Sequence, residues 1–209
     1  PPIRSGPPSG SIESAQASNT TQSLNGAAFV GAQIGWAVGD AGTIVHTTNG
    51  GATWTPQTSG TQEPLFATTC ADQNICWAVG GTADDTNPTQ IILHTTDGGT
   101  SWTQQMGDPD FPEPLYGVTN IDAQTAWVVG DSGIIEATTD GGVHWVFQES
   151  GVLDLLSAVA FVDARNGWVV AGSRWSSIRA PGGSARSSFR PGPSCVSRHR
   201  AGPTSRRRA

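Results

Sequence analysis

One eight-residue string recurs three times along this chain. TTNGGATW occupies residues 47–54, TTDGGTSW residues 95–102 and TTDGGVHW residues 138–145. In the first and third copies a second tryptophan precedes the closing one by the same spacing: Trp36 before Trp54, and Trp127 before Trp145. In the middle copy Trp77 and Trp102 lie further apart, because GTADDTNPTQ contains seven extra residues. A fixed period of this kind predicts a repeat architecture, in which each unit packs against its neighbours.

The upstream tryptophans set the period of the repeat. They are Trp36, Trp77, Trp127 and Trp168, and their spacing is constant apart from the insertion and two linking residues between Trp77 and Trp127. Each unit holds short segments rich in Val, Ile, Thr and aromatic residues and bounded by Gly, Asn, Asp or Pro, which is the pattern of β-strands. Four strands per unit at this period predict an all-β fold, a β-propeller of four-stranded antiparallel blades that is incomplete in this chain.

The recurring string has a structural explanation. Its Asn or Asp side chain is suited to bond backbone N–H groups in an Asx-type turn, and its glycines supply positive φ. Its Trp returns to the sheet as a large apolar anchor. Binding of a ligand or of calcium by these turns is the alternative. The structural residues that we predict here are Asn49, Gly51, Trp54, Asp97, Gly99, Trp102, Asp140, Gly142 and Trp145.

The pattern S/T-x-D-x-G-x-T/S-W resembles the Asp-box of the bacterial neuraminidase repeat (BNR) families. Combined with GWAVGD and GTIVHTTNGGATW, it is similar to the Ycf48/Hcf136-like photosystem II assembly factors over roughly residues 24–172. The resemblance implies a secreted, periplasmic or lumenal scaffold that binds a protein partner. In photosynthetic members that partner is a reaction-centre subunit. The resemblance also implies a basic, Arg-rich patch for docking.

Charge is divided sharply along the sequence. All 17 carboxylates lie between Glu13 and Asp163, whereas the 11 cationic side chains are Arg4 and ten arginines from Arg165 onward. Residues 5–164 therefore lack the basic patch that the resemblance implies, and they repel nucleic acid and anionic membranes. We predict no nucleic-acid partner for the propeller part. We also predict no membrane span, because no apolar run approaches about 18 residues.

Composition divides the chain into three segments. Residues 1–22 are predicted to be a flexible polar linker, residues 23–172 the propeller blades, and residues 173–209 a disordered tail rich in Arg, Gly, Pro and Ser. A further unit with the spacing of the others would bring an Asp and a Trp to positions 181 and 186, where the chain has Pro181 and Arg186. The tail is therefore either a genuine polyanion-binding segment or the product of GC-rich DNA translated in a wrong frame.

Two cysteines stand at repeat positions that hold other residues elsewhere. Cys70 replaces Phe29 of the first unit and Cys76 replaces Gly35, so the pair brackets the turn between the first two strands of its unit. We predict a disulfide between them, which implies an oxidising, extracytoplasmic compartment. Two free buried thiols are the alternative. No metal site and no cofactor is predicted, because no further Cys or suitable His cluster accompanies the pair.

The first strand of each unit is the place where a binding surface is expected, because inner strands line the channel of a propeller. Between a constant Leu and a small residue, this strand carries one position that varies in size and polarity: Asn25, Phe66, Tyr116 and Ser157. We predict contact with a partner at Phe66 and Tyr116, and at Asp84 and Asp85 in the inserted segment 82–88. Simple variation in packing is the alternative.

No catalytic residue is predicted. The sialidase members of the Asp-box families need an arginine cluster, and residues 5–164 contain no arginine. The alternative function is a xyloglucanase-like glycoside hydrolase that works through two carboxylates, or a propeller that binds carbohydrate. Its candidate acids would be Asp84, Asp85, Asp108, Asp110 and Glu113.

Overall fold

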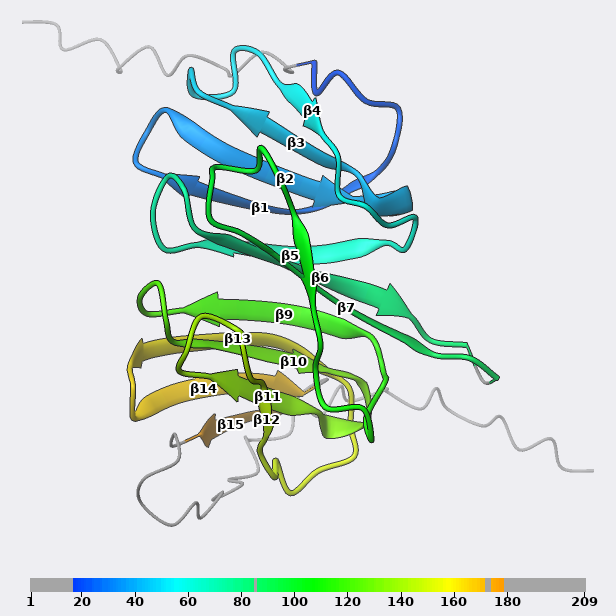
Figure 1. The fold of residues 1–209 in the computed structure, drawn as a ribbon. Helices are drawn as coiled ribbons and strands as arrows, with labels where there is room; N and C mark the ends of the chain where they lie inside the picture. The colour runs from blue at the N-terminus through cyan, green and yellow to red at the C-terminus, as the bar shows by residue number, and fades with distance from the viewer. Residues whose placement is uncertain (1–16, 85, 172–173, 179–209) are drawn as a thin grey trace, which may run out of the picture.

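A computed structural model describes residues 17–84, 86–171 and 174–178 of the chain. In this part of the chain, four antiparallel sheets follow one another in sequence order, and Figure 1 shows them stacked as successive layers. Within each sheet every strand pairs with the next strand along the sequence. The predicted all-β fold class is confirmed: these sheets are successive blades of a partial propeller.

The strand bounds agree closely with the sequence pattern. The first sheet contains β1 (Leu24–Val30), β2 (Ile34–Gly39), β3 (Ile44–Thr47) and β4 (Thr55–Gln57). The second contains β5 (Leu65–Cys70), β6 (Cys76–Thr82), β7 (Thr89–Thr95) and β8 (Thr103–Gln105). The third contains β9 (Leu115–Asn120), β10 (Ala126–Gly130), β11 (Ile135–Thr138) and β12 (Val146–Phe147). The fourth contains β13 (Leu156–Asp163), β14 (Asn166–Ala171) and β15 (Arg174–Ile178).

Strand β15 lies inside the segment that composition assigns to a tail. It pairs antiparallel with β14 and gives the fourth sheet its third strand. The Pro181 and Arg186 positions, like the rest of 179–209 and residues 1–16, lie outside the described residues. The assignments of 1–22 to a linker and of 173–209 to a disordered tail or a wrong-frame product therefore stay predictions.

The hydrophobic core lies between neighbouring sheets. The upstream tryptophans Trp36, Trp77 and Trp127 are at most 1% exposed, and each packs toward the following sheet. The closing Trp102 and Trp145 pack from the other side, against the preceding sheet. Burying one such side chain stabilises the fold by about 1.5–3 kcal/mol, so each blade depends on its neighbours.

In the outermost sheets, the corresponding residues are exposed where the described residues provide no neighbouring sheet. The constant leucine of the first strand is 0% exposed in the second, third and fourth sheets, but Leu24 of the first sheet is 39% exposed. Trp168 of the fourth sheet is 43% exposed, unlike its three counterparts. These residues lie on the outward faces of the first and last sheets, where the described residues provide no further blade. Leu24 is therefore the one constant leucine of the first strands that is not a core residue among the described residues.

The first strands of the sheets lie next to one another. Strand β5 lies between β1 and β9, and β9 also contacts β13, as the inner strands of a propeller do. Their approach is close: a Cβ on Gly26 would lie 2.7 Å from the Phe66 carbonyl oxygen, and one on Gly117 would lie 3.2 Å from the Ala158 Cα. Small residues at these positions allow the inner strands to pack. No helix among the described residues is long and apolar enough to span a bilayer.

Candidate functional site

A β-bulge interrupts each inner strand at its variable position. The register of β5 passes from Leu65 to Ala67, which leaves Phe66 without a partner on β6. The same interruption occurs on the other three inner strands, at Asn25, Tyr116 and Ser157. A bulge leaves one residue out of the ladder and redirects its side chain, and bulges are frequent beside functional sites. We call these four positions, Asn25, Phe66, Tyr116 and Ser157, the bulge residues.

The two aromatic bulge residues lie together. The ring centroids of Phe66 and Tyr116 are 5.0 Å apart, with their planes tilted by 31°. Both side chains are half-buried, so each offers part of its ring to a ligand. Burial, followed by the negative charge of Asp131, raises the pKa of Tyr116 and keeps its hydroxyl protonated. The structure thus joins Phe66 and Tyr116, the two contact residues that the sequence singled out on these strands.

Carboxylates stand at equivalent places beside the bulge residues. Between the second and third strands, the first and third sheets carry short 3-10 turns, Asp40–Gly42 and Asp131–Gly133. The Asn25 side chain donates to the Asp40 carboxylate at 2.9 Å and to the Leu65 carbonyl oxygen at 3.0 Å. The surface is therefore an aromatic pair flanked by acidic groups, and it suits apolar, neutral or cationic ligand groups.

The inserted segment of the second unit replaces the short turn with a longer β6–β7 hairpin. Gly81, at its base, donates its N–H to the Pro64 carbonyl oxygen, immediately before the strand that carries Phe66. Within this hairpin the Asp84 carboxylate accepts hydrogen bonds from Thr86 and Asn87. These hydrogen bonds lower the pKa of Asp84. Asp85, the second predicted contact of the insertion, lies outside the described residues.

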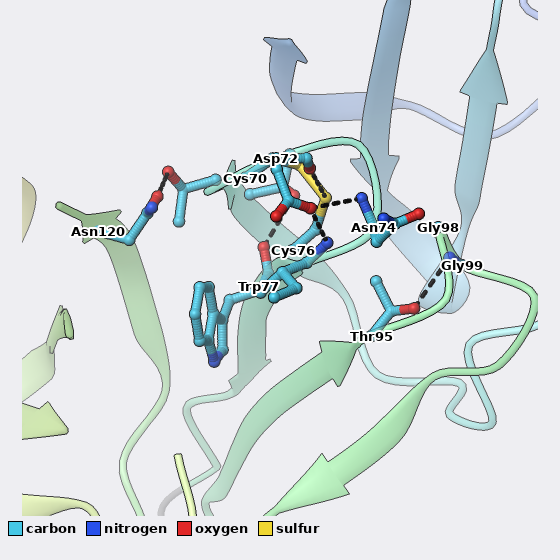
Figure 2. Close-up of a disulfide and its surroundings, with 12 residues drawn as sticks. Cys70, Asp72, Asn74, Cys76, Trp77, Thr95, Gly98, Gly99 and Asn120 are labelled. Carbon is cyan, nitrogen blue, oxygen red and sulfur yellow. Dashed lines mark hydrogen bonds between the residues drawn. A yellow bond between two sulfur atoms is a disulfide. The ribbon is translucent and has the colours of Figure 1, made fainter. Parts of the chain in front are cut away.

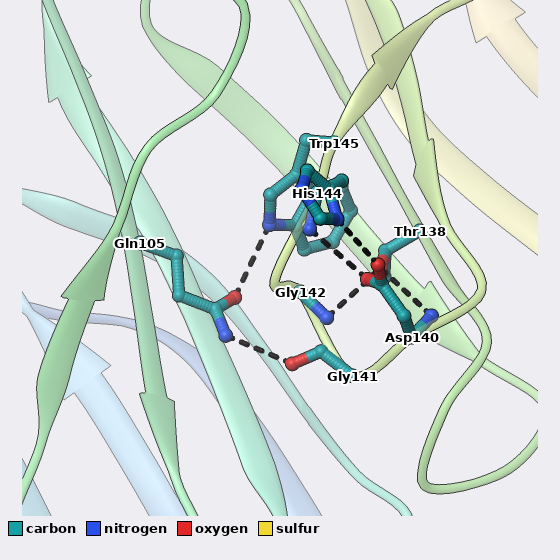
Figure 3. Close-up of polar contacts among 7 residues, drawn as sticks. All are labelled: Gln105, Thr138, Asp140, Gly141, Gly142, His144 and Trp145. Atoms are coloured by element: carbon teal, nitrogen blue, oxygen red, sulfur yellow. Dashed lines mark hydrogen bonds and ion pairs between the residues drawn. The ribbon is translucent and has the colours of Figure 1, made fainter.

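The recurring strings form closing turns of one geometry. In the third sheet the Thr138 hydroxyl donates to the Asp140 carboxylate at 2.8 Å and accepts from the Gly142 N–H at 2.8 Å (Figure 3). The His144 N–H donates to Asp140 at 3.0 Å, and the His144 ring contacts the same carboxylate at 2.7 Å. The Thr–Asx bond and the glycine N–H bond recur in the other two turns, at Asn49 and Asp97.

The hydrogen bonds of these turns favour ionised carboxylates. Hydrogen bonds from the hydroxyl and the backbone N–H of Ser101 are the main cause of the low pKa of Asp97, about 2. Hydrogen bonds from the backbone N–H and then the ring of His144 lower the pKa of Asp140, also to about 2. Each carboxylate accepts hydrogen bonds from its own turn, and the structural role of these residues stays a prediction.

A glutamine from the preceding sheet holds each of the second and third closing turns. The Gln105 amide donates to the Gly141 carbonyl oxygen at 2.9 Å and accepts from the Trp145 indole N–H at 3.1 Å (Figure 3). Gln57 makes the same two contacts with Gly98 and Trp102, at 2.9 and 3.0 Å. We call this arrangement the glutamine clamp.

The clamp also explains the second glycine of the string. A Cβ on Gly99 or Gly142 would overlap the clamping amide, and both residues have positive φ, +82° and +84°. Sequence reasoning did not find the glutamines, although a Gln recurs three residues after each closing tryptophan.

Cys70 and Cys76 form a disulfide, as the sequence predicts (Figure 2). They are directly paired residues of β5 and β6, at the end where these strands are joined by a tight turn. Asp72 accepts hydrogen bonds from the backbone of Asn74 and Ile75 and closes that turn. In the first and fourth sheets the corresponding Phe ring lies over the corresponding Gly, so the disulfide takes the place of an aromatic contact.

Of the acids proposed for glycoside hydrolysis between the second and third sheets, Asp108 has structural partners. The Asp108 carboxylate accepts from the N–H of Asp110, within one loop between the second and third sheets. The Asp108 N–H in turn donates to Glu136 at 3.2 Å. One oxygen of Glu113 is buried and has no partner among the described residues. The bond from the Asp108 N–H to Glu136 anchors this loop on β11.

Glu136 is a residue that sequence reasoning missed. It is 0% exposed on β11, and burial is the main influence that raises its pKa. Gln90 donates to its carboxylate at 2.8 Å. The available signal was a Glu at the repeat position that holds Val45 and Leu93 in the other units.

Comparison with known proteins decides the family. The profile of the photosynthesis system II assembly factor YCF48 matches residues 12–154, more than half of the chain. The chain belongs to the YCF48 family. No curated protein matches it.

Solved structures agree with this membership. A structure described as YCF48 bound to D1 peptide is 26% identical, with a TM-score of 0.63, and the match covers 83% of this chain and 55% of that one. YCF48 from Cyanidioschyzon merolae is 20% identical, with a TM-score of 0.63 and coverage of 83% and 58%. This chain thus spans a little over half of either structure. The GH74 enzyme of Niastella koreensis, at 16% identity, TM-score 0.59 and coverage of 78% and 30%, shares the fold alone.

Proposed function

We propose that this chain is a non-catalytic propeller module that holds a protein partner during assembly of a complex. Photosystem II is the complex that its family indicates. The observation that carries the proposal is the pairing of Phe66 and Tyr116 at two successive bulges of the inner strands. A related YCF48 has been solved with a D1 peptide, which supports a peptide segment as the ligand.

The chemistry of the bulge surface favours a particular kind of segment. Half-exposed aromatic rings contribute much of the binding energy at protein interfaces, so an apolar side chain of the partner would pack on Phe66 and Tyr116. Asp40 and Asp131 beside them would accept hydrogen bonds from backbone N–H or cationic groups. Because residues 5–164 carry no Lys or Arg, a cationic segment would also be steered toward the surface.

The compartment that we propose is extracytoplasmic: periplasmic, lumenal or secreted. The disulfide between Cys70 and Cys76 supports it, because such bonds persist in oxidising compartments.

Binding of a fluorescent D1 peptide to the full chain, followed by anisotropy, tests the function. We expect Phe66→Ala and Tyr116→Ala each to weaken binding at least about tenfold, since aromatic anchors at interfaces contribute roughly 2 kcal/mol or more. Met106→Ala is the matched control, because Met106 is 76% exposed and lies after β8, away from the inner strands. Unchanged affinity in both aromatic variants, with normal stability, would refute the assigned surface.

Glycoside hydrolysis is the competing function, and the same preparation addresses it. Hydrolysis of a β-glucan or sialoside that disappears in Asp84→Asn, Asp108→Asn or Asp110→Asn would replace the binding function with an enzymatic one. The hydrogen bonds that already occupy Asp84 and Asp108 lead us to expect no such activity.

A further inference from the structure

The first and third units each contain a cavity at the same place in the repeat. Each cavity lies between the 3-10 turn that follows the second strand, the outermost strand, and the loop that follows that strand. The volumes are about 470 Å³ in the first unit and about 420 Å³ in the third. Both fall within the range of about 300–1,000 Å³ that is common for ligand pockets. We call them the first-unit cavity and the third-unit cavity.

The backbone around the two cavities is the same. In the first unit the Ser59 hydroxyl donates to the Thr61 carbonyl oxygen at 3.2 Å. In the third unit the Ser150 hydroxyl donates to the Val152 carbonyl oxygen at 3.0 Å. A Cβ on the last glycine of either 3-10 turn would overlap the same carbonyl oxygen, so the turn and the loop are in close contact. The two cavities therefore differ in their side chains and not in their framework.

Three lining positions change character between the two cavities. On the outermost strand a proline becomes a phenylalanine, and in the following loop two neutral polar side chains become a carboxylate and a leucine. The pairs are Pro56 and Phe147, Thr58 and Glu149, and Gln62 and Leu153. The third-unit cavity is thereby suited to an apolar group with a positive charge beside it.

Contacts within the chain hold the apolar wall of the third-unit cavity in place. The rings of Phe111 and Phe147 stack with their centroids 4.3 Å apart and their planes at 13°. Gln90 donates to the Phe111 carbonyl oxygen at 3.2 Å and anchors the loop that carries this ring. Leu153 also lines the cavity and is 88% exposed, so it offers nearly its whole side chain to a ligand. A preformed wall reduces the entropy that is lost on binding.

Electrostatics select the charge of the occupant. Glu149 lines the third-unit cavity, Asp154 directly follows Leu153, and both acidic residues are exposed. Residues 5–164 contain no Lys or Arg, so no such side chain of this range neutralises the two carboxylates. A cationic group is therefore favoured beside the cavity, and an anionic group is repelled.

The third-unit cavity lies close to the bulge surface. The 3-10 turn Asp131–Gly133 separates the two, and its last two residues line the cavity. The N–H of its first residue donates to the Pro114 carbonyl oxygen at 3.1 Å, two residues before Tyr116. One short turn therefore lies between the aromatic bulge residues and the cavity.

We propose that the third-unit cavity is a second anchor site for a protein partner, and that it takes an apolar side chain directly beside a Lys or Arg. The apolar side chain packs on Phe111, Phe147 and Leu153, and the cation lies near Glu149. This site rests on the proposed function for the existence of a protein partner, whereas the chemistry of the occupant follows from the cavity alone. The first-unit cavity does not take the same segment, because neither an aromatic pair nor a carboxylate lines it.

Short peptides added to the full chain test this site, with NMR of the backbone amides as the readout. The probe is acetyl-Gly-Phe-Lys-Gly-amide, which should shift the amide resonances of residues 149–153. Replacing its Phe by Ala should weaken binding at least about tenfold, because the burial of the ring is lost. Replacing its Lys by Glu should weaken binding about fivefold at low salt, because attraction to Glu149 becomes repulsion.

Variants of the chain locate the two parts of the site. Leu153→Ser should weaken binding of the probe at least about threefold, and the exposure of Leu153 lets the variant keep its fold. Glu149→Gln should remove most of the difference between the Lys and Glu probes. Gln62→Ser is the matched control, because Gln62 holds the equivalent position in the first-unit cavity, and it should change neither result.

The outcomes separate this site from the proposed function. Unmoved resonances of residues 149–153, equal affinity for the Lys and Glu probes, or unchanged affinity in Leu153→Ser would overturn the cavity site and leave the bulge surface standing. If the probe binds at 149–153 as expected while Phe66→Ala and Tyr116→Ala leave the affinity for the D1 peptide unchanged, the cavity site is supported and the bulge surface fails.

Discussion

Removal of one glutamine clamp should weaken one boundary between blades by a calculable amount. Gln105→Ala deletes the bond from the Trp145 indole N–H at 3.1 Å and the bond to the Gly141 carbonyl oxygen at 2.9 Å. A hydrogen bond of this kind contributes about 1 kcal/mol net, so we expect a loss of about 2 kcal/mol. Trp145 is only 7% exposed, which leaves its indole N–H poorly placed to bond water instead.

Urea denaturation of the full chain, followed by tryptophan fluorescence and circular dichroism, measures this loss. In a thermal melt, a change of about 2 kcal/mol should lower the melting temperature by roughly 4–8 °C in a chain of this size. Gln104→Ala is the matched control, because Gln104 precedes Gln105 on the same strand but is exposed. It should stay within about 0.5 kcal/mol of the parent protein.

Two results would contradict a stabilising role for the clamp. One is a Gln105→Ala variant as stable as the Gln104→Ala control, which would show that the clamp contributes nothing net. The other is a Gln148→Ala variant that loses as much as Gln105→Ala, since the Gln148 Nε2 has no partner to lose among the described residues.

Three further predictions concern the turns and the disulfide. Asp97 has a folded-state pKa of about 2, so its stabilising effect is present above the unfolded pKa of about 3.9 and is lost as pH falls toward about 2. Asp97→Asn should therefore flatten the dependence of melting temperature on pH in this window, and Asn49→Asp should steepen it. Gly142→Ala should destabilise the third sheet, because Gly142 has positive φ and the new Cβ would overlap the Gln105 side chain. The loss of stability should be smaller in the Gln105→Ala background, and additive effects in a double-mutant cycle would contradict the overlap. Reduction of the disulfide between Cys70 and Cys76 should lower the free energy of unfolding by about 2 kcal/mol, measured by urea denaturation with and without reductant. The double variant Cys70→Phe and Cys76→Gly should recover part of this stability and should be insensitive to reductant.

Much of the fold could be predicted because its signals are local. The closing turns follow from Thr, Asp and Gly within one short string, and the strands from short runs of β-forming residues between turn formers. The bond between Cys70 and Cys76 is equally local, since its two residues face each other across one tight turn. The period then fixed how many such units the chain holds, and hence the propeller class.

The candidate site could be predicted only in part. The variability of Phe66 and Tyr116 marked them in the sequence, but the bulges that redirect their side chains depend on the pairing of β5 with β6 and of β9 with β10. Their 5.0 Å contact joins residues from two blades, and no spacing in the sequence encodes it.

The repeat, its turns, its disulfide and the acidic character of the blades follow from the residues alone, because each depends on residue type and short spacing. The tertiary structure decided what happens between blades: the clamps that join Gln57 to Trp102 and Gln105 to Trp145, the burial of Glu136, and the unpartnered Gln148 among the described residues. Each clamp joins residues far apart in the sequence, so it exists only once neighbouring sheets have packed. These contacts depend on tertiary structure because each blade buries its tryptophan against the next blade and does not complete a core of its own.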